Sequence, residues 1–249
     1  MASVEGAGVP LAFTERGAGP AVLLVHGMAD GVGGWDDIVS ALEGSARIIT
    51  YDRRGYGGSG APEPYERTTV EEQAEDAAAL MHALEAAPAV LCGRDFGALV
   101  CLDLCKRHAD LVRAAAVLDA PVLQFSAAAA EVLSAERLLL EQALRDGGPA
   151  RAVDAWLDAR GEPADTARRA RARADHAAFF ADYGGLAAWP VTRGELRALT
   201  MPLAVLTSAG APVPVREASD AVASLAPAAR RWDGADLAAA VGALVVGAT

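Results

Sequence analysis

The stretch Val90-Leu91-Cys92-Gly93-Arg94-Asp95-Phe96-Gly97-Ala98-Leu99-Val100 decides how this chain folds. A short apolar run ends at Gly93, and a new apolar pattern with helical spacing begins at Phe96, which predicts a strand, a sharp turn and a helix. Glycines flank Asp95 and let the turn tighten around it, so that its side chain stands at the end of the strand on a strained backbone. Asp95 is therefore the first candidate for a functional side chain.

Strands and helices alternate on both sides of this turn. The sequence predicts strands over 11–16, 21–25, 47–51, 114–118, 203–207 and 229–232. It predicts helices over 35–42, 69–86, 96–108, 215–225 and 237–246. Such alternation is typical of an α/β fold, in which a parallel sheet carries helices on both faces.

Residues 122–198 interrupt this alternation with a helical stretch rich in Ala and Arg. We expect it to be a helical cap over the carboxyl ends of the strands, where open α/β sheets bind ligands. Residues 1–121 and 199–249 would then form the core. The basic run at 168–173 is interpreted as a solvated helix face rather than a site for an anionic substrate.

Composition narrows the classes of partner. The net charge of −11 argues against nucleic acid, and no apolar run is long enough to span a membrane. The first residues lack the basic and apolar regions of a signal peptide, so we expect a cytoplasmic protein. Lys106 is the single lysine, which indicates a GC-rich, bacterial genome. The sequence is compatible with a homodimer but does not predict one.

The cysteines are interpreted as reduced core thiols. Cys92, Cys101 and Cys105 lie in one predicted strand and the helix after it, and no further Cys or His joins them with the spacing of a metal site. The sequence also carries no phosphate-binding or dinucleotide-binding glycine motif. We therefore expect no metal and no cofactor.

Three segments together resemble the α/β-hydrolase superfamily. His26-Gly27 follows a buried strand as in the HG motif, 52–59 resembles the D-x-R-G-x-G-x-S loop, and 93–97 resembles the nucleophile elbow. The resemblance implies an α/β-hydrolase fold, with a mostly parallel sheet, flanking helices and an inserted helical cap. It also implies that the backbone N–H groups of Met28 and Phe96 form an oxyanion hole.

Other positions depart from the pattern of that superfamily. Residues 208–212, where the catalytic acid is expected, carry no carboxylate, and the position that best matches the catalytic His is Asp236. Asp119 is interpreted as hydrogen-bonding the turn before Pro121 rather than as a displaced acid. Epoxide hydrolases and haloalkane dehalogenases also have Asp at the elbow, where it attacks carbon and a His-activated water then cleaves the ester.

The first hypothesis makes Asp95 a general acid and base. A carboxyl group desolvated under an apolar cap has a raised pKa that suits proton transfer. The enzyme would be a cofactor-independent cyclase, isomerase or lyase acting on a medium-sized apolar metabolite of secondary metabolism. Asp236 would share a proton with Asp95 if it enters the site, and His176 and Tyr183 in the cap are further candidates.

The substrate is expected to lie among side chains that are mostly aromatic: His26, Trp35, Phe125, Phe179, Phe180 and Trp189. Two alternatives stay open. One is a hydrolase of the epoxide, haloalkane or ester type with Asp95 as nucleophile. The other is a catalytically silent protein that binds a small molecule or a partner.

Overall fold

The apolar runs of the sequence form the inner strands of one sheet. The structure is a computed structural model and describes residues 1–164, 166–232, 234 and 236–247. Its eight strands lie in the order β1-β2-β4-β3-β5-β6-β7-β8. They are β1 (Ala2–Glu5), β2 (Pro10–Arg16), β3 (Ala21–Val25), β4 (Arg47–Tyr51), β5 (Ala89–Arg94), β6 (Val112–Leu118), β7 (Leu203–Leu206) and β8 (Ala229–Arg231).

The sheet is mostly parallel. β1 and β2 pair antiparallel, β2 and β4 pair antiparallel, and every pair from β4 to β8 is parallel. This arrangement confirms the predicted α/β-hydrolase fold. The sequence did not predict β1, a four-residue edge strand in which Ala2 lies opposite Phe13.

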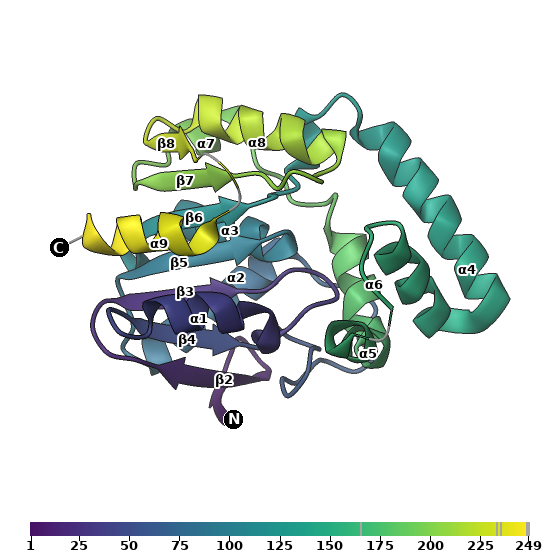
Figure 1. The fold of residues 1–249 in the computed structure, drawn as a ribbon, viewed down its shortest axis with the longest axis horizontal. Helices are drawn as coiled ribbons and strands as arrows, with labels where there is room; N and C mark the ends of the chain where they lie inside the picture. The colour runs from purple at the N-terminus through teal and green to yellow at the C-terminus, as the bar shows by residue number, and fades with distance from the viewer. Residues whose placement is uncertain (165, 233, 235, 248–249) are drawn as a thin grey trace.

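Helices cover both faces of the sheet (Figure 1). One face carries α1 (Asp36–Leu42), which follows the short 3-10 turn η1 (Val32–Trp35), and α9 (Leu237–Val246). The other carries α2 (Val70–Ala83), α3 (Phe96–Arg107) and α8 (Val213–Leu225). Along β3, Val22 and Leu24 pack under the first group while Leu23 and Val25 pack under the second. A continuous apolar run therefore fits a strand that is buried on both faces.

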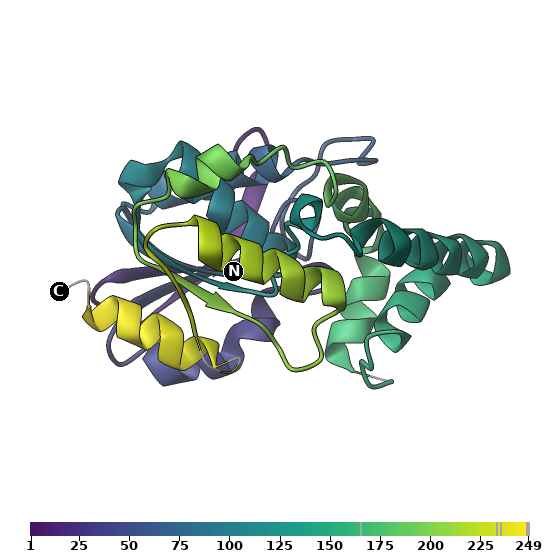
Figure 2. The ribbon, with the colours of Figure 1, turned by 90° about the horizontal axis from the view of Figure 1, so that it is seen from above.

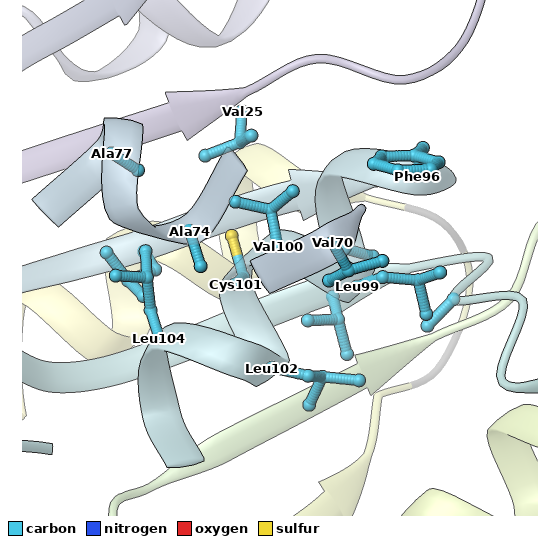
Figure 3. Close-up of a cluster of buried hydrophobic side chains, with 14 of the residues drawn as sticks. Val25, Val70, Ala74, Ala77, Phe96, Leu99, Val100, Cys101, Leu102 and Leu104 are labelled. Carbon is cyan, nitrogen blue, oxygen red and sulfur yellow. The ribbon is translucent and has the colours of Figure 1, made fainter. Parts of the chain in front are cut away.

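The larger core lies between the sheet, α2 and α3. Figure 3 shows Val100 and Leu104 of α3 beside Ala74 and Ala77 of α2, with Val25 of β3 above them. The alanines leave room for the two helices to pack closely. Burial of large apolar side chains such as Val100 and Leu104 stabilises the fold by about 1.5–3 kcal/mol each.

Three helices stand over the carboxyl ends of the parallel strands: α4 (Ala129–Asp158), α5 (Ala167–Ala174) and α6 (His176–Gly185) (Figure 1). α4 extends away from the sheet (Figure 2) and bends back at Gly147 and Gly148, where the backbone leaves the helical conformation. α7 (Arg193–Arg197) lies beside α8 instead, although the sequence had placed its residues in the cap. The chain also makes the short turns η2 (Ala109–Leu111) and η3 (Leu123–Phe125).

A buried ion pair joins the cap to the core. Asp182 of α6 accepts from Arg53 Nη2 at 2.6 Å, from the Tyr56 hydroxyl at 2.7 Å and from Gln73 at 2.8 Å, and all four side chains are buried. The Arg53 guanidinium also donates to the carbonyl of Gly27 at 3.0 Å. The cap is therefore tied to the loop after β3.

The basic run at 168–173 is only in part the solvated face that the sequence predicted, since Arg168 and Arg173 are 38% and 44% exposed but Arg169 is not. Arg169 is 3% exposed and donates to the Asp154 carboxylate and to the Glu162 carbonyl. Arg168 reaches the Ala29 carbonyl of the core. Acidic residues of α4 and of the loop after it neutralise the run, which the local sequence does not show.

The structure bears on the cysteines and on the search for membrane-spanning helices. Cys92, Cys101 and Cys105 are buried free thiols, and burial raises the pKa of Cys92 to about 12. This agrees with their interpretation as reduced core residues. Within the described ranges, no helix combines the length and apolarity that crossing a bilayer requires.

Candidate active site

Asp95 sits on a strained turn between β5 and α3. Its φ is +52° and its ψ is −125°, a conformation that costs a non-glycine residue about 1–3 kcal/mol. A Cβ on Gly93 would overlap the Gly97 carbonyl, and one on Gly97 would overlap the carbonyls of Val25 and His26. The glycines therefore let α3 start against β3, and this close approach fixes the direction of the Asp95 side chain.

The Asp95 carboxylate is held from the neighbouring strand. The Met28 backbone N–H, in the loop after β3, donates to Oδ2 at 3.0 Å. Burial raises the pKa of Asp95, and the Met28 hydrogen bond and the positive charges of Arg160 and Arg53 oppose that rise without cancelling it. The group is therefore a carboxyl that holds its proton more firmly than an exposed Asp.

A cavity of about 50 Å³ lies against Asp95. Its walls are mostly apolar and come from the core, the cap and the start of α8. They are Met28, Asp95, Pro121, Leu123, Ala129, Val132, Leu133, Glu136, Trp156, Arg160, Leu186, Pro212, Pro214 and Val215. Since about 10–15 Å³ on this scale holds one water, the cavity has room for a small group.

The cap adds a charged pair to this cavity. Arg160 Nη2 donates to Glu136 Oε1 at 2.5 Å, and the guanidinium lies 3.5 Å from the centroid of the Trp156 ring. Tyr183 stands next to the pair: burial, followed by the Glu136 carboxylate, raises the pKa of its hydroxyl to about 12. A second carboxylate thus shares the cavity with Asp95, and it comes from α4.

Met28 lies where the sequence expected it, but its amide is already engaged with Asp95. Phe96 is fully buried at the start of α3, with the Arg53 guanidinium 4.9 Å from its ring centroid. Of the two N–H groups expected to form an oxyanion hole, that of Met28 binds the Asp95 carboxylate in this structure, and the role of both groups toward a substrate stays a prediction.

None of the four histidines, all of which lie in the described part of the chain, lines the cavity. His26 was expected to contact substrate, but it is fully buried, with Nδ1 at 2.8 Å from the Gly27 carbonyl and Nε2 accepting from the Arg53 amide. Burial lowers its pKa well below the usual range, so it is a neutral structural residue. His176 begins α6 away from the cavity walls, His82 is exposed on α2, and His108 pairs with Glu75.

Asp236 does not join Asp95. It is exposed, and its carboxylate accepts from the Ala239 amide at 2.9 Å as the N-cap of α9. Helix capping is a common use of Asp at this position. Asp119, with φ +53°, accepts from the Ser208 amide at 2.8 Å, so it joins the ends of β6 and β7 instead of the turn before Pro121.

The expected substrate-binding aromatics mostly pack in the core or within the cap. Trp35 is fully buried under Arg94, and Trp189 donates to Asp103 at 2.8 Å. Phe179 is fully buried between Trp156 and Tyr183. Phe180 packs on Phe179, and Phe125 lies under Arg193. Their apolar area serves packing, and none of the five belongs to the walls of the cavity.

Sequence reasoning missed Glu136, Trp156 and Arg160. The four-residue spacing of Trp156 and Arg160 was a signal, because such residues share one face of a helix. Nothing local pointed to Glu136, which meets Arg160 only because Gly147 and Gly148 turn α4 back on itself. Among the described residues, no cluster of three or more His, Cys, Asp or Glu side chains could hold a metal ion.

Comparison with known proteins agrees with this geometry. A family model described as alpha/beta hydrolase fold matches residues 20–158. Bifunctional epoxide hydrolase 2 of Sus scrofa is 33% identical over 117 residues, 47% of this chain and 21% of that protein. Epoxide hydrolase A of Mycobacterium tuberculosis is 35% identical over 123 residues, 48% of this chain and 38% of that protein. The match thus spans well under two thirds of either relative.

The fold also occurs among solved structures. An alpha/beta hydrolase from Sphaerobacter thermophilus superposes with a TM-score of 0.77 over 100% of both chains at 23% identity. At that identity the likeness concerns the fold alone.

Proposed function

This chain belongs to the α/β-hydrolase family, and from that premise we propose that it is an enzyme in which Asp95 moves protons on an apolar small molecule. The reaction would be non-hydrolytic: a ring closure, an isomerisation or a lyase cleavage. Relatives named epoxide hydrolases support an enzyme of this family.

One observation carries the choice of proton transfer: a carboxyl with a raised pKa faces an apolar cavity whose walls include no histidine in the part of the chain that is described. Hydrolysis through an ester intermediate needs a base that activates water. His26, which directly follows β3, could not serve as that base, because both of its ring nitrogens are engaged in hydrogen bonds. Proton transfer needs only the carboxyl itself.

The proposal gives different tasks to the two carboxyl oxygens. The Met28 amide holds Oδ2, which supports Oδ1 as the oxygen that would give and take the proton. Met28 and the elbow glycines fix the carboxyl before the substrate binds, which lowers the cost of reaching the transition state.

A substrate-independent test of this function is the ring opening of 5-nitrobenzisoxazole. A carboxylate removes the carbon-bound proton, the C–H electron pair forms the nitrile, and the N–O bond breaks to release a coloured nitrophenolate. We expect turnover above the buffer rate that falls to the buffer rate in Asp95→Asn and persists in Asp236→Asn, a matched control on an exposed carboxylate. Equal rates for the wild type and Asp95→Asn would contradict the proposal.

Similarity to epoxide hydrolases favours a second candidate, in which Asp95 is a nucleophile. Oδ1 would attack an epoxide carbon, the C–O bond would break, and the alkoxide would take a proton from water. Intact-protein mass spectrometry after incubation with styrene oxide tests this candidate. A stable adduct on Asp95 would favour the nucleophilic mechanism over proton transfer. An unmodified protein that still opens the benzisoxazole would favour proton transfer.

A further inference from the structure

One of the two amides expected to receive a substrate oxyanion is already occupied. Met28 N–H donates to Asp95 Oδ2 at 3.0 Å, so it stabilises the charge of the base and not that of the product. When Asp95 takes a proton from carbon, negative charge develops on the substrate. With Met28 engaged, the Phe96 amide alone faces that charge, and a positively charged donor stabilises it further, because in an apolar site an uncompensated charge is costly.

Arg160 is the single cationic side chain among the described walls of the cavity. Its guanidinium lies over the Trp156 ring, Nη2 donates to Glu136, and Nη1 donates to the Trp156 carbonyl at 3.4 Å. These contacts hold the planar group in place while other N–H bonds of its five stay available to a ligand. Trp156 is 3% exposed, which keeps the platform rigid.

The charge of Arg160 acts on the reacting carboxyl. Among the charged side chains around Asp95, Arg160 makes the largest contribution and lowers the pKa of that carboxyl against the effect of burial. Glu136 balances part of the positive charge, so the pair forms a polar wall in an otherwise apolar cavity.

We infer that Arg160 is the electrophilic residue of the reaction and that the substrate is an apolar carbonyl compound with an acidic C–H next to its carbonyl group. The inference rests on the proposed proton transfer. Asp95 Oδ1 takes the proton, the C–H electron pair becomes the C=C bond, and the carbonyl π pair moves to oxygen. The enolate oxygen accepts a hydrogen bond from Arg160, and protonation by Asp95 at carbon reverses the step.

This assignment conserves the charge of the site. Before the step the negative charge lies on Asp95, and after it the charge lies on the enolate oxygen beside Arg160. A buried charge that moves from one set of donors to another avoids the penalty of leaving a charge unpaired. The rival role for Arg160 is structural, as a tie between the turn after α4 and Glu136 in the first half of that helix.

The test is hydrogen–deuterium exchange of cyclopentanone and 2-indanone in D₂O, followed by proton NMR. We expect the wild type to exchange the acidic hydrogens faster than buffer, and Arg160→Gln to lower the enzyme-dependent rate at least tenfold. Arg160→Lys keeps the charge and is expected to retain part of the rate. The matched control is Arg137→Gln on α4, whose exposed side chain pairs with Glu141, and it is expected to exchange like the wild type.

The pH profile distinguishes a local electrostatic effect of Arg160→Gln from a loss of folded protein, and the binding measurement then tests contact with the substrate oxygen. Because Arg160 lowers the pKa of Asp95, Arg160→Gln should move the midpoint of the rate profile to higher pH. A loss of folded protein would lower the rate without moving that midpoint. Thermal melts of each variant establish which fraction is folded.

A binding measurement covers the case in which Arg160→Gln is poorly folded. The nitronate of nitrocyclopentane carries an enolate-like charge on oxygen, and calorimetry should show at least tenfold weaker binding to Arg160→Lys or Arg160→Gln than to the wild type or Arg137→Gln. Exchange that depends on Asp95 but equals the wild type in Arg160→Gln would overturn the inference and leave the proposed function standing. A wild type that opens the benzisoxazole through Asp95 but exchanges both ketones at the buffer rate would also overturn the inference, whereas benzisoxazole opening at the buffer rate would overturn the proposed function itself.

Discussion

The Met28 amide, in the loop after β3, donates to the Asp95 carboxylate at the end of β5, across 3.0 Å. β3 and β5 are neighbours in the sheet, so their carboxyl ends bring these two loops together. Gly27 permits the approach, because a Cβ there would lie 2.9 Å from the Cβ of Asp95. The contact engages Oδ2 with the protein, and in the proposed mechanism Oδ1 is the oxygen that meets the substrate.

The first prediction concerns pH. Burial raises the pKa of Asp95 above the ordinary 3.8, and a general base works only when it is ionised. We therefore expect the benzisoxazole rate to rise with pH and to reach half its plateau clearly above pH 3.8. A pH–rate profile from pH 4 upwards measures this midpoint, and a rate already at its plateau at pH 4 would contradict the raised pKa.

The second prediction concerns the stability of Asp95→Asn. A carboxyl whose pKa is raised in the fold favours the folded state while protonated, and that contribution is lost as pH rises through the raised pKa. Asn carries no charge and its oxygen can still accept from Met28. At pH 8 we expect the variant to unfold about 2–4 °C higher than the wild type, which corresponds to about 1 kcal/mol in a domain of this size.

The difference between Asp95→Asn and the wild type should shrink as the pH falls through the raised pKa of Asp95, and it should level off only below the ordinary 3.8, where the carboxyl is protonated in the folded and the unfolded state alike. Asp220→Asn is the control, since that carboxylate is 69% exposed. Melting curves across the pH range decide the point. A difference that stays constant with pH would mean that ionisation of Asp95 does not affect stability.

The fold could be read from the sequence because its signals are local. Apolar runs such as 21–25 and 89–94 are strands in the structure, and the helix predicted to begin at 69 starts there because the Thr69 side chain caps α2 by accepting from the Glu72 amide. Gly93 and Gly97 allow the tight turn that carries Asp95, because a side chain at either glycine would overlap the backbone. Each of these features depends on neighbours within a few residues.

The cavity walls that the cap contributes could not be predicted from local sequence. Glu136 and Arg160 are 24 positions apart and meet only because α4 bends at Gly147 and Gly148. Aromatic residues of the cap, such as Phe179, were assigned to substrate because composition does not distinguish a cavity wall from the interior of a helical layer.

The third prediction separates Asp236 from the site. Its carboxylate caps α9 through the Ala239 amide, and the loss of such a cap costs about 0.5–2 kcal/mol. Asp236→Ala should therefore unfold at a lower urea concentration while it keeps the wild-type rate of benzisoxazole opening. Asp236→Ser, which retains a capping oxygen, should recover most of the stability. A loss of rate in both variants would return Asp236 to the active site.

The fourth prediction concerns the elbow. A methyl group on Gly97 would overlap the carbonyls of Val25 and His26, which belong to the backbone and cannot move aside. We expect Gly97→Ala to lose more than about 3 kcal/mol of folding free energy or to be insoluble, as overpacking at a rigid site predicts. Gly194→Ala is the matched control: its nearest neighbour would be 3.8 Å away in helix α7, and it should gain up to about 1 kcal/mol.

The last prediction concerns the tie between cap and core. Asp182 is fully buried and accepts from Arg53, Tyr56 and Gln73, so Asp182→Asn leaves the Arg53 charge buried without its counter-charge. Breaking such a pair costs about 3–5 kcal/mol. Asp158→Asn, at a carboxylate that is 56% exposed and pairs with Arg169, should cost at most about 1 kcal/mol.

Urea unfolding of both variants gives this comparison, and Arg53→Met combined with Asp182→Leu extends it. If the cost of Asp182→Asn comes from an unpaired charge, the double variant should be more stable than Asp182→Asn, because it removes both charges together. Since Arg53 also holds the Gly27 carbonyl, one residue before Met28, the double variant should still open the benzisoxazole more slowly than the wild type. Equal stability of Asp182→Asn and Asp158→Asn would show that the buried pair does not tie the cap to the core.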